Sequence, residues 1–182
     1  MLFFFIISFL TGVITKYSDH LADEVKKNTL AIGIILSLIY GIFVGYLMAA
    51  DARFLVLILG IILGNIFSKK IDHLNHQIAF VPIILIVALS GLPANILLYL
   101  PLTIVFFIAA YLDEQLNSNK KARKALKKKL GRIYLIAKYR LVLEVATLIV
   151  SVVLWDPTFS LLLISFDLGY ILLAKVASKN LK

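Results

Sequence analysis

The sequence contains no cysteine, which excludes disulfide bonds, thiolate catalysis and metal sites built from thiolates. Carboxylate, imidazole and hydroxyl groups are left to carry any chemistry. Charged residues are also scarce, at 16%, whereas 62% of the residues are hydrophobic. A soluble domain with so few charges would lack an adequate polar surface. The composition therefore predicts a protein whose solvent is lipid.

Apolar stretches recur along the whole chain, each close to the roughly 20 residues that cross a bilayer as a helix. They predict an all-α integral membrane protein with a bundle of about seven transmembrane helices, at residues 2–18, 29–50, 53–70, 77–92, 94–112, 133–155 and 158–177. The fourth is the weakest because it is short and contains Pro82, and a re-entrant segment is its alternative. No stretch is left for a soluble domain, so we expect one transmembrane domain over residues 1–182.

Basic residues set the expected orientation. With the N-terminus outside, every one of the 19 Lys and Arg residues except Arg53 falls on the cytoplasmic side, where the C-terminus also lies. The net charge of +9 is thus explained by topology and by attraction to anionic lipid rather than by nucleic acid. We expect a multi-pass protein of the cell membrane, with membrane lipids as partners and no nucleic acid.

A polar motif occurs twice, at residues 15–24 and 68–77. Each copy has Ser or Thr followed by Lys, then two variable positions and Asp-His-Leu, and each follows an odd-numbered span. This placement predicts a parallel repeat of hairpins, with units at about 1–52 and 53–93. A fainter third copy lies at 111–115 and overlaps the start of a basic cytoplasmic loop at 113–132. A C-terminal hairpin is expected after this loop, at 133–177.

The motif residues are candidate metal ligands. If a helix continues through each copy, Asp19 with Asp23 and Asp72 with His76 lie one turn apart on one face, a spacing that offers two ligands to one cation. Asp113 is a further candidate from the third copy. Carboxylates favour Mg²⁺ or Mn²⁺, with Zn²⁺ less favoured as the divalent cation. The alternative is that these residues only cap helices and solvate a membrane exit.

Three further residues are candidate catalytic groups. His73 is a candidate ligand or proton-transfer group, because imidazole titrates near neutrality. Glu144 and Asp167 lie about 17 Å from the turn between the last two spans, near the bilayer midplane, where ionisable groups face a protein interior. They are expected at the floor of a cytoplasmic cavity. Alternatively, Arg140 neutralises Glu144, and Asp167 is protonated and bonded to a neighbouring helix.

Basic residues are the candidates for binding a substrate phosphate or a lipid phosphate, and they are Lys16, Lys69, Lys127, Lys128 and Arg140. The basic loop is expected to attract anionic headgroups. Two glycine pairs, Gly41 with Gly45 and Gly60 with Gly64, predict close helix packing.

Three functions are compatible with this pattern. The first is a metal-dependent enzyme acting on a lipid or isoprenoid phosphate at the cytoplasmic face. Its Asp-x₃-Asp spacing resembles an aspartate-rich motif of membrane prenyltransferases, but the chain is too short for that family and lacks the Asn-led first motif, so membership is not assigned. The second is a cation- or proton-coupled transporter or channel that uses Glu144 and Asp167. The third is a structural subunit of a membrane complex.

Overall fold

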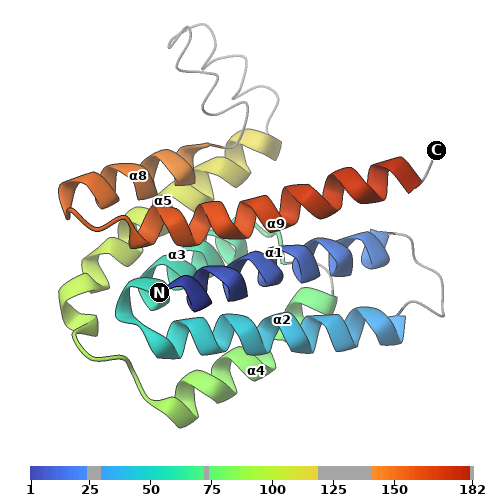
Figure 1. Ribbon diagram of the computed structural model, residues 1–182, viewed down its shortest axis with the longest axis horizontal. Coiled ribbons are helices and arrows are strands. Elements are labelled where there is room, and N and C mark those ends of the chain that lie inside the picture. The colour runs from blue at the N-terminus through green and yellow to red at the C-terminus, as the bar shows by residue number, and fades with distance from the viewer. Residues whose placement is uncertain (24–29, 72–73, 119–140, 181–182) are drawn as a thin grey trace, which may run out of the picture. The chain divides into compact units, whose positions relative to one another are not determined.

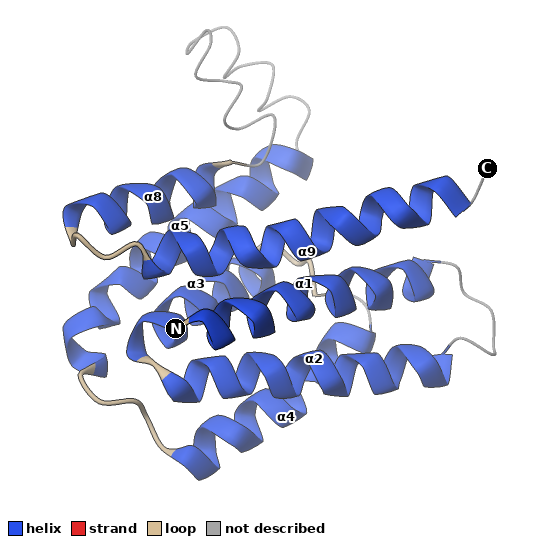
Figure 2. Cartoon of the chain, in the orientation of Figure 1, coloured by secondary structure: helices blue, strands red, loops and turns tan. Residues whose placement is uncertain are grey.

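The computed structural model of the chain describes residues 1–23, 30–71, 74–118 and 141–180 (Figure 1). Within these ranges the chain forms seven helices and no strand (Figure 2), which confirms the all-α prediction. The helices are α1 (Leu2–Asp23), α2 (Leu30–Ala50), α3 (Ala52–Phe67), α4 (Leu74–Ser90), α5 (Ile96–Ser118), α8 (Val142–Val153) and α9 (Thr158–Asn180).

Four of the described helices, α1, α2, α5 and α9, are long and apolar enough to cross a membrane. The other three are shorter apolar helices, and the 16 residues of α3 extend over about 24 Å. Large apolar side chains also cover much of the surface, for example Leu89 at 78% and Leu97 at 80% exposure. Lipid solvates such a surface well whereas water does not, so the helices fit a membrane protein.

The chain divides into two compact units that interleave along the sequence. The first unit comprises Met1–Leu55, Asp72–Ala94 and Leu161–Lys182, and the second comprises Val56–Ile71 and Asn95–Ser160. Four helices, α1, α2, α4 and α9, make up most of the first unit. The second is built mainly from α3, α5 and α8.

In the first unit, α1 lies between α2 and α9 (Figure 1). The hydroxyls of Ser18 on α1 and Ser37 on α2 are 3.1 Å apart, while Phe4, at the opposite end of α1, stacks on Tyr46. These contacts make α1 and α2 antiparallel. The Ser8 hydroxyl donates to the carbonyl oxygen of Leu162 on α9 at 2.8 Å.

Helices α2 and α4 pack closely at the first predicted glycine pair. A Cβ atom on Gly41 would lie 2.6 Å from the Pro82 side chain, and one on Gly45 would lie 3.1 Å from Ile83 Cα. Real Cβ atoms rarely approach so closely, so only glycine lets the two helices meet here. Pro82 lies inside α4, which is a continuous helix as far as Ser90. The packing prediction is confirmed, and the short helix expected for this segment is present, while its full crossing of the membrane stays a prediction.

The second glycine pair joins α3 to α5 in the second unit. A Cβ atom on Gly60 would lie 2.6 Å from Phe106 Cβ, and one on Gly64 would lie 2.6 Å from Ala110 Cβ. The contacts advance in the same direction along both helices, so α3 and α5 are parallel. This packing prediction is confirmed as well.

The second copy of the polar motif departs from the expected continuous helix. Helix α3 ends at Phe67, and Lys69 follows with a left-handed φ of 58°. The amides of Lys69 and Lys70 donate to the carbonyl oxygens of Ile66 and Asn65, which is the hydrogen-bond pattern of a Schellman cap. The helix therefore stops directly before this copy, and α4 starts within it, at Leu74. In the first copy the expectation is correct, because α1 continues to Asp23.

The predicted sixth span, 133–155, corresponds to α8, which covers Val142–Val153. The earlier part of that prediction lies outside the described residues. Helix α5 extends further than predicted, to Ser118 instead of residue 112.

Candidate functional site

Several polar side chains of the first unit meet around one carboxylate, that of Asp19 on α1. His76, near the start of α4, places its Nε2 atom 3.1 Å from Asp19 Oδ1. The two side chains are mostly buried, with exposed fractions of 19% for Asp19 and 25% for His76. Each motif copy thus contributes one residue to a single polar pair.

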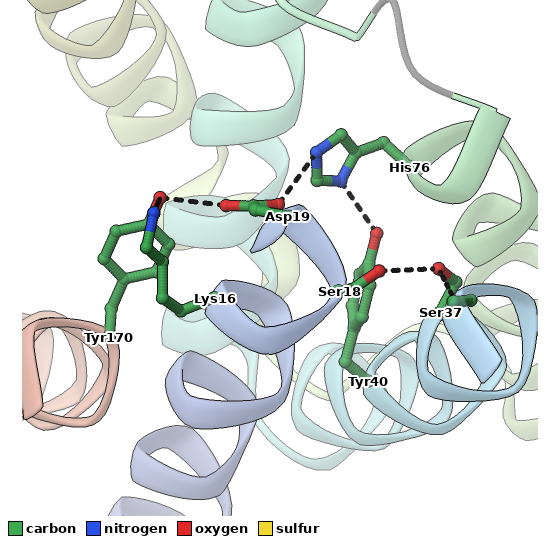
Figure 3. A network of polar contacts seen from close by, with 8 residues as sticks. Lys16, Ser18, Asp19, Ser37, Tyr40, His76 and Tyr170 are labelled. Atoms are coloured by element: carbon green, nitrogen blue, oxygen red, sulfur yellow. Dashed lines mark hydrogen bonds and ion pairs between the residues drawn. The ribbon is translucent and has the colours of Figure 1, made fainter. Parts of the chain in front are cut away.

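Two tyrosine hydroxyls extend this pair. Tyr170 on α9 donates a hydrogen bond to Asp19 Oδ2 at 2.8 Å, and the Tyr40 hydroxyl on α2 lies 2.9 Å from His76 Nδ1. Figure 3 shows Asp19 between Tyr170 and His76, with Tyr40 beyond the imidazole. Side chains from four helices therefore form one chain of polar contacts.

Lys16 completes this arrangement. Its ammonium lies 4.9 Å from the centroid of the Tyr170 ring and 3.5 Å from the hydroxyl of the same residue. A cation over a tyrosine ring is attracted by the ring quadrupole. The Tyr170 hydroxyl therefore bridges a cation and an anion. We call Lys16, Tyr170, Asp19, His76 and Tyr40 the Asp19 network.

Glycine contacts place Tyr170 in this network. A Cβ atom on Gly12 would collide with the carbonyl oxygen of Phe166, and one on Gly169 would collide with that of Phe9. The two backbones thus touch reciprocally where α1 crosses α9. Gly169 directly precedes Tyr170, so the close approach of the helices brings the tyrosine hydroxyl within reach of Asp19. On the other side, Tyr40 directly precedes Gly41 in the same way.

Two proton arrangements fit the His76 ring. In the neutral ring with its proton on Nε2, Nδ1 accepts a hydrogen bond from Tyr40, and Nε2 lies 3.1 Å from Asp19 Oδ1, a buried atom that accepts no hydrogen bond among the described residues. In the charged ring, the Nδ1–H group donates to the Tyr40 oxygen instead.

The structure brings together three residues that the sequence singled out, namely Asp19, His76 and Lys16. Asp167 lies on α9, three residues before Tyr170, and is partly exposed. Asp23 ends α1, but its side chain is outside the described part of the chain. The other candidates outside the described residues are Asp72, His73, Lys127, Lys128 and Arg140.

Asp113 in the second unit is buried at the start of α8. The amide groups of Val142 and Leu143 donate to its Oδ1 and Oδ2 atoms at 3.0 and 2.9 Å. These amides are among the first of the helix and have no partner within it, so Asp113 acts as a cap supplied by α5. The contact is what the capping interpretation expects. A metal-binding role for Asp113 stays a prediction.

The remaining candidates of the second unit are Glu144 and Lys69. Glu144 lies in the first turn of α8, where its carbonyl oxygen accepts a hydrogen bond from Thr147. Lys69 occupies the left-handed position after α3, and its neighbour Lys70 lies 3.6 Å from the buried carboxylate of Glu114. Glu144 and Asp167 belong to different units, so the cavity that they were expected to share stays a prediction.

Known proteins give no guide to this site. No protein-family model, curated protein or solved structure matches the chain. Its geometry must carry the functional argument.

Metal binding stays a prediction. Among the residues that the structure describes, no three Asp, Glu or His side chains form a group able to hold a metal ion. Asp72, His73 and the side chain of Asp23, which belong to the predicted ligand set, lie outside those residues.

Sequence reasoning missed Tyr40 and Tyr170. The signal was present, because a tyrosine in an apolar span needs a partner for its hydroxyl when it is buried. Each of them also adjoins a glycine, in the pairs Tyr40-Gly41 and Gly169-Tyr170. A tyrosine beside a helix-crossing glycine is held near a neighbouring helix, and this makes it a candidate for contact with a polar side chain there.

Proposed function

We propose that this chain is a multi-pass protein of the cell membrane, with seven spans, an external N-terminus, a cytoplasmic C-terminus and a duplicated hairpin. The helix directions within the units support this proposal. Contacts advance in parallel between α2 and α4 and between α3 and α5, whereas α1 and α2 are antiparallel. Alternating spans produce these relations, and the distribution of basic residues supplies the orientation.

The absence of cysteine makes the topology directly testable. Single cysteines in place of Asn95 and Lys69 lie at predicted external and cytoplasmic ends, respectively. In intact cells, a membrane-impermeant maleimide should label Asn95→Cys but should label Lys69→Cys only after permeabilisation. Labelling of Lys69→Cys in intact cells would contradict the proposed orientation.

Within this protein we propose proton movement, as a proton-coupled transporter or channel, through the Asp19 network. The observation that supports it is the chain of contacts Tyr170–Asp19–His76–Tyr40, contributed by four helices. Carboxylate, imidazole and phenol groups in contact are the components of proton relays in membrane proteins. This assignment differs from the transport site first expected at Glu144 and Asp167.

His76 is suited to pass a proton between its neighbours. A proton that reaches Nδ1 from the side of Tyr40 makes the ring cationic, and the ring then releases the Nε2 proton to Asp19. The ring returns to neutrality with its proton on Nδ1, and rotation of the imidazole or a change of tautomer returns the proton to Nε2 before the next transfer. Asp19 holds the proton until the proton leaves on the side of Tyr170. On that side the ammonium of Lys16 compensates the negative charge that Asp19 regains.

Proton flux into liposomes tests this proposal. Purified protein is reconstituted around a trapped pH-sensitive dye, and a valinomycin-driven potassium potential draws protons inward. We expect acidification with the unaltered chain and a loss on the order of 100-fold in Asp19→Asn, the scale of a lost proton-transfer group. Tyr170→Phe should also slow the flux, because it removes the hydroxyl that contacts Asp19.

Asp51→Asn is the matched control, since Asp51 pairs with Arg53 in the turn between α2 and α3 and not with the network. It should conduct like the unaltered chain. Equal flux in Asp19→Asn and Asp51→Asn would contradict the relay, as would the absence of flux in the unaltered chain.

A second candidate is the metal-dependent enzyme acting on a lipid or isoprenoid phosphate. The contact of 3.1 Å between Asp19 and His76 favours it, because a carboxylate and an imidazole side by side are usable metal ligands. A bound Mg²⁺ or Mn²⁺ would neutralise phosphate oxygens. However, Tyr40 contacts His76 Nδ1 and Tyr170 contacts Asp19 Oδ2, so ligation through these two atoms would require those contacts to be replaced.

Titration with Mn²⁺, followed by electron paramagnetic resonance, separates the two candidates. Uptake by the unaltered chain that is lost in Asp19→Asn and His76→Gln would favour the enzyme. No uptake, together with proton flux that depends on Asp19, would favour transport.

A further inference from the structure

The turn between α8 and α9 holds the single tryptophan of the sequence, Trp155, in an unfavourable backbone conformation. Its φ is 53°, in the left-handed region that bulky side chains rarely adopt. The amides of Trp155 and Asp156 donate to the carbonyl oxygens of Val152 and Ser151, so Trp155 occupies the position of a Schellman cap that glycine normally fills.

Contacts among the described residues do not offset this strain. The side chain of Trp155 is 93% exposed, so almost none of its large apolar surface is covered by protein. A glycine would adopt the same turn without strain. A favourable interaction of the indole must therefore come from outside the chain.

The surroundings of Trp155 indicate what that environment is. The last residues of α8 are apolar and exposed, at 65% for Val152, 69% for Val153 and 44% for Leu154. On the other side, the carboxylate of Asp156 accepts a hydrogen bond from the amide of Thr158. The turn thus has an apolar side continuous with α8 and a polar side at the start of α9.

We infer that Trp155 anchors the α8–α9 turn in the headgroup region of the lipid bilayer. An indole prefers this region because its ring is apolar while its N–H group can still bond to water or to lipid oxygens. The apolar side chains of Val152, Val153 and Leu154 face the acyl chains, and Asp156 faces water. This inference rests on the proposed membrane placement but does not depend on the Asp19 network.

Depth-dependent fluorescence quenching tests the anchor directly, because the unaltered chain has only one tryptophan. The protein is reconstituted in vesicles of phosphatidylcholine brominated either close to the headgroup or close to the chain end. Emission from Trp155 should be quenched more strongly by the shallow bromines than by the deep ones. Aqueous iodide should quench it weakly.

A relocated tryptophan provides the matched control. In Trp155→Phe combined with Leu148→Trp, the indole moves to an exposed position of α8, seven residues before the turn and about 10 Å along the helix. Deep bromines should quench this variant more than they quench the unaltered chain. The shift from shallow to deep quenching supports the assigned depth.

Other outcomes would overturn the inference. Quenching of Trp155 by iodide but not by brominated lipid would place the turn in water, and quenching by neither would place it against protein. Failure of the chain to float with the vesicles would contradict the membrane placement itself. Loss of proton flux has no bearing on this result, so the two proposals fail separately.

Discussion

Replacing Asp113 with alanine should strongly destabilise the second unit. Asp113 is 5% exposed, and its two oxygens accept the amides of Val142 and Leu143. A hydrogen bond to a charged group contributes about 1.5–3 kcal/mol, and loss of a helix cap costs about 0.5–2 kcal/mol. Because the two bonds share one carboxylate, we expect a total loss of about 2–4 kcal/mol for Asp113→Ala. Asp113→Asn should lose roughly half as much, since its amide retains one acceptor oxygen.

The measurement is unfolding by SDS in mixed micelles, supported by thermal melting, where this loss corresponds to about 5–15 °C. Asp156→Ala is the control, because Asp156 caps α9 by accepting the amide of Thr158 at 3.0 Å, and its loss should cost about 1 kcal/mol. EDTA should leave the difference between Asp113→Ala and the unaltered chain unchanged. A loss no greater than that of Asp156→Ala would refute the capping argument, and a difference abolished by EDTA would favour metal binding.

Two further substitutions test the helix contacts and the strained turn. Gly169→Ala should force α1 from α9, because its new Cβ would collide with the Phe9 carbonyl, and thermal melting should report a loss of about 1–3 kcal/mol. Gly45→Ala should lose less stability, because its new Cβ would lie 3.1 Å from its nearest neighbour, Ile83 Cα. A larger loss for Gly45→Ala than for Gly169→Ala would contradict the packing argument. Lys69→Gly should raise stability by about 0.5–1 kcal/mol in the SDS assay, because glycine adopts the φ of 58° without strain. A loss of stability would show that the Lys69 side chain stabilises the fold by more than its left-handed backbone conformation destabilises it.

Most of the helices were predictable, because long apolar runs leave few other structures for a chain in lipid. The glycine pairs Gly41/Gly45 and Gly60/Gly64 were also readable, since small residues four apart mark close helix contacts. The end of α3 was not predictable from the sequence. A Schellman cap is recognised from sequence by glycine at its left-handed position, and here that position holds Lys69.

The charged members of the candidate site and its histidine were predictable, but its two tyrosines and the pairing of its side chains were not. Asp19 and His76 stood out because each belongs to a repeated motif. Their contact with each other depends on how α1, α2 and α4 pack, and a one-dimensional pattern with a period of 3.6 residues carries no such information. The hydroxyl of Tyr170 reaches Asp19 across a separation of 151 residues, and its place depends on the glycine crossing of α1 and α9.

The contrast between Asp19 and Asp113 shows why similar motif residues need not share a role. Both carboxylates are largely buried, but Asp113 meets two backbone amides whose protons are fixed, whereas Asp19 meets a tyrosine and a histidine whose protons can move. Backbone amides hold a carboxylate as a structural cap. Side chains with transferable protons give a carboxylate the means to exchange a proton. The motif supplies the acid, and the neighbouring helices determine whether that acid caps a helix, as Asp113 does, or contacts side chains suited to the proposed proton transfer, as Asp19 does.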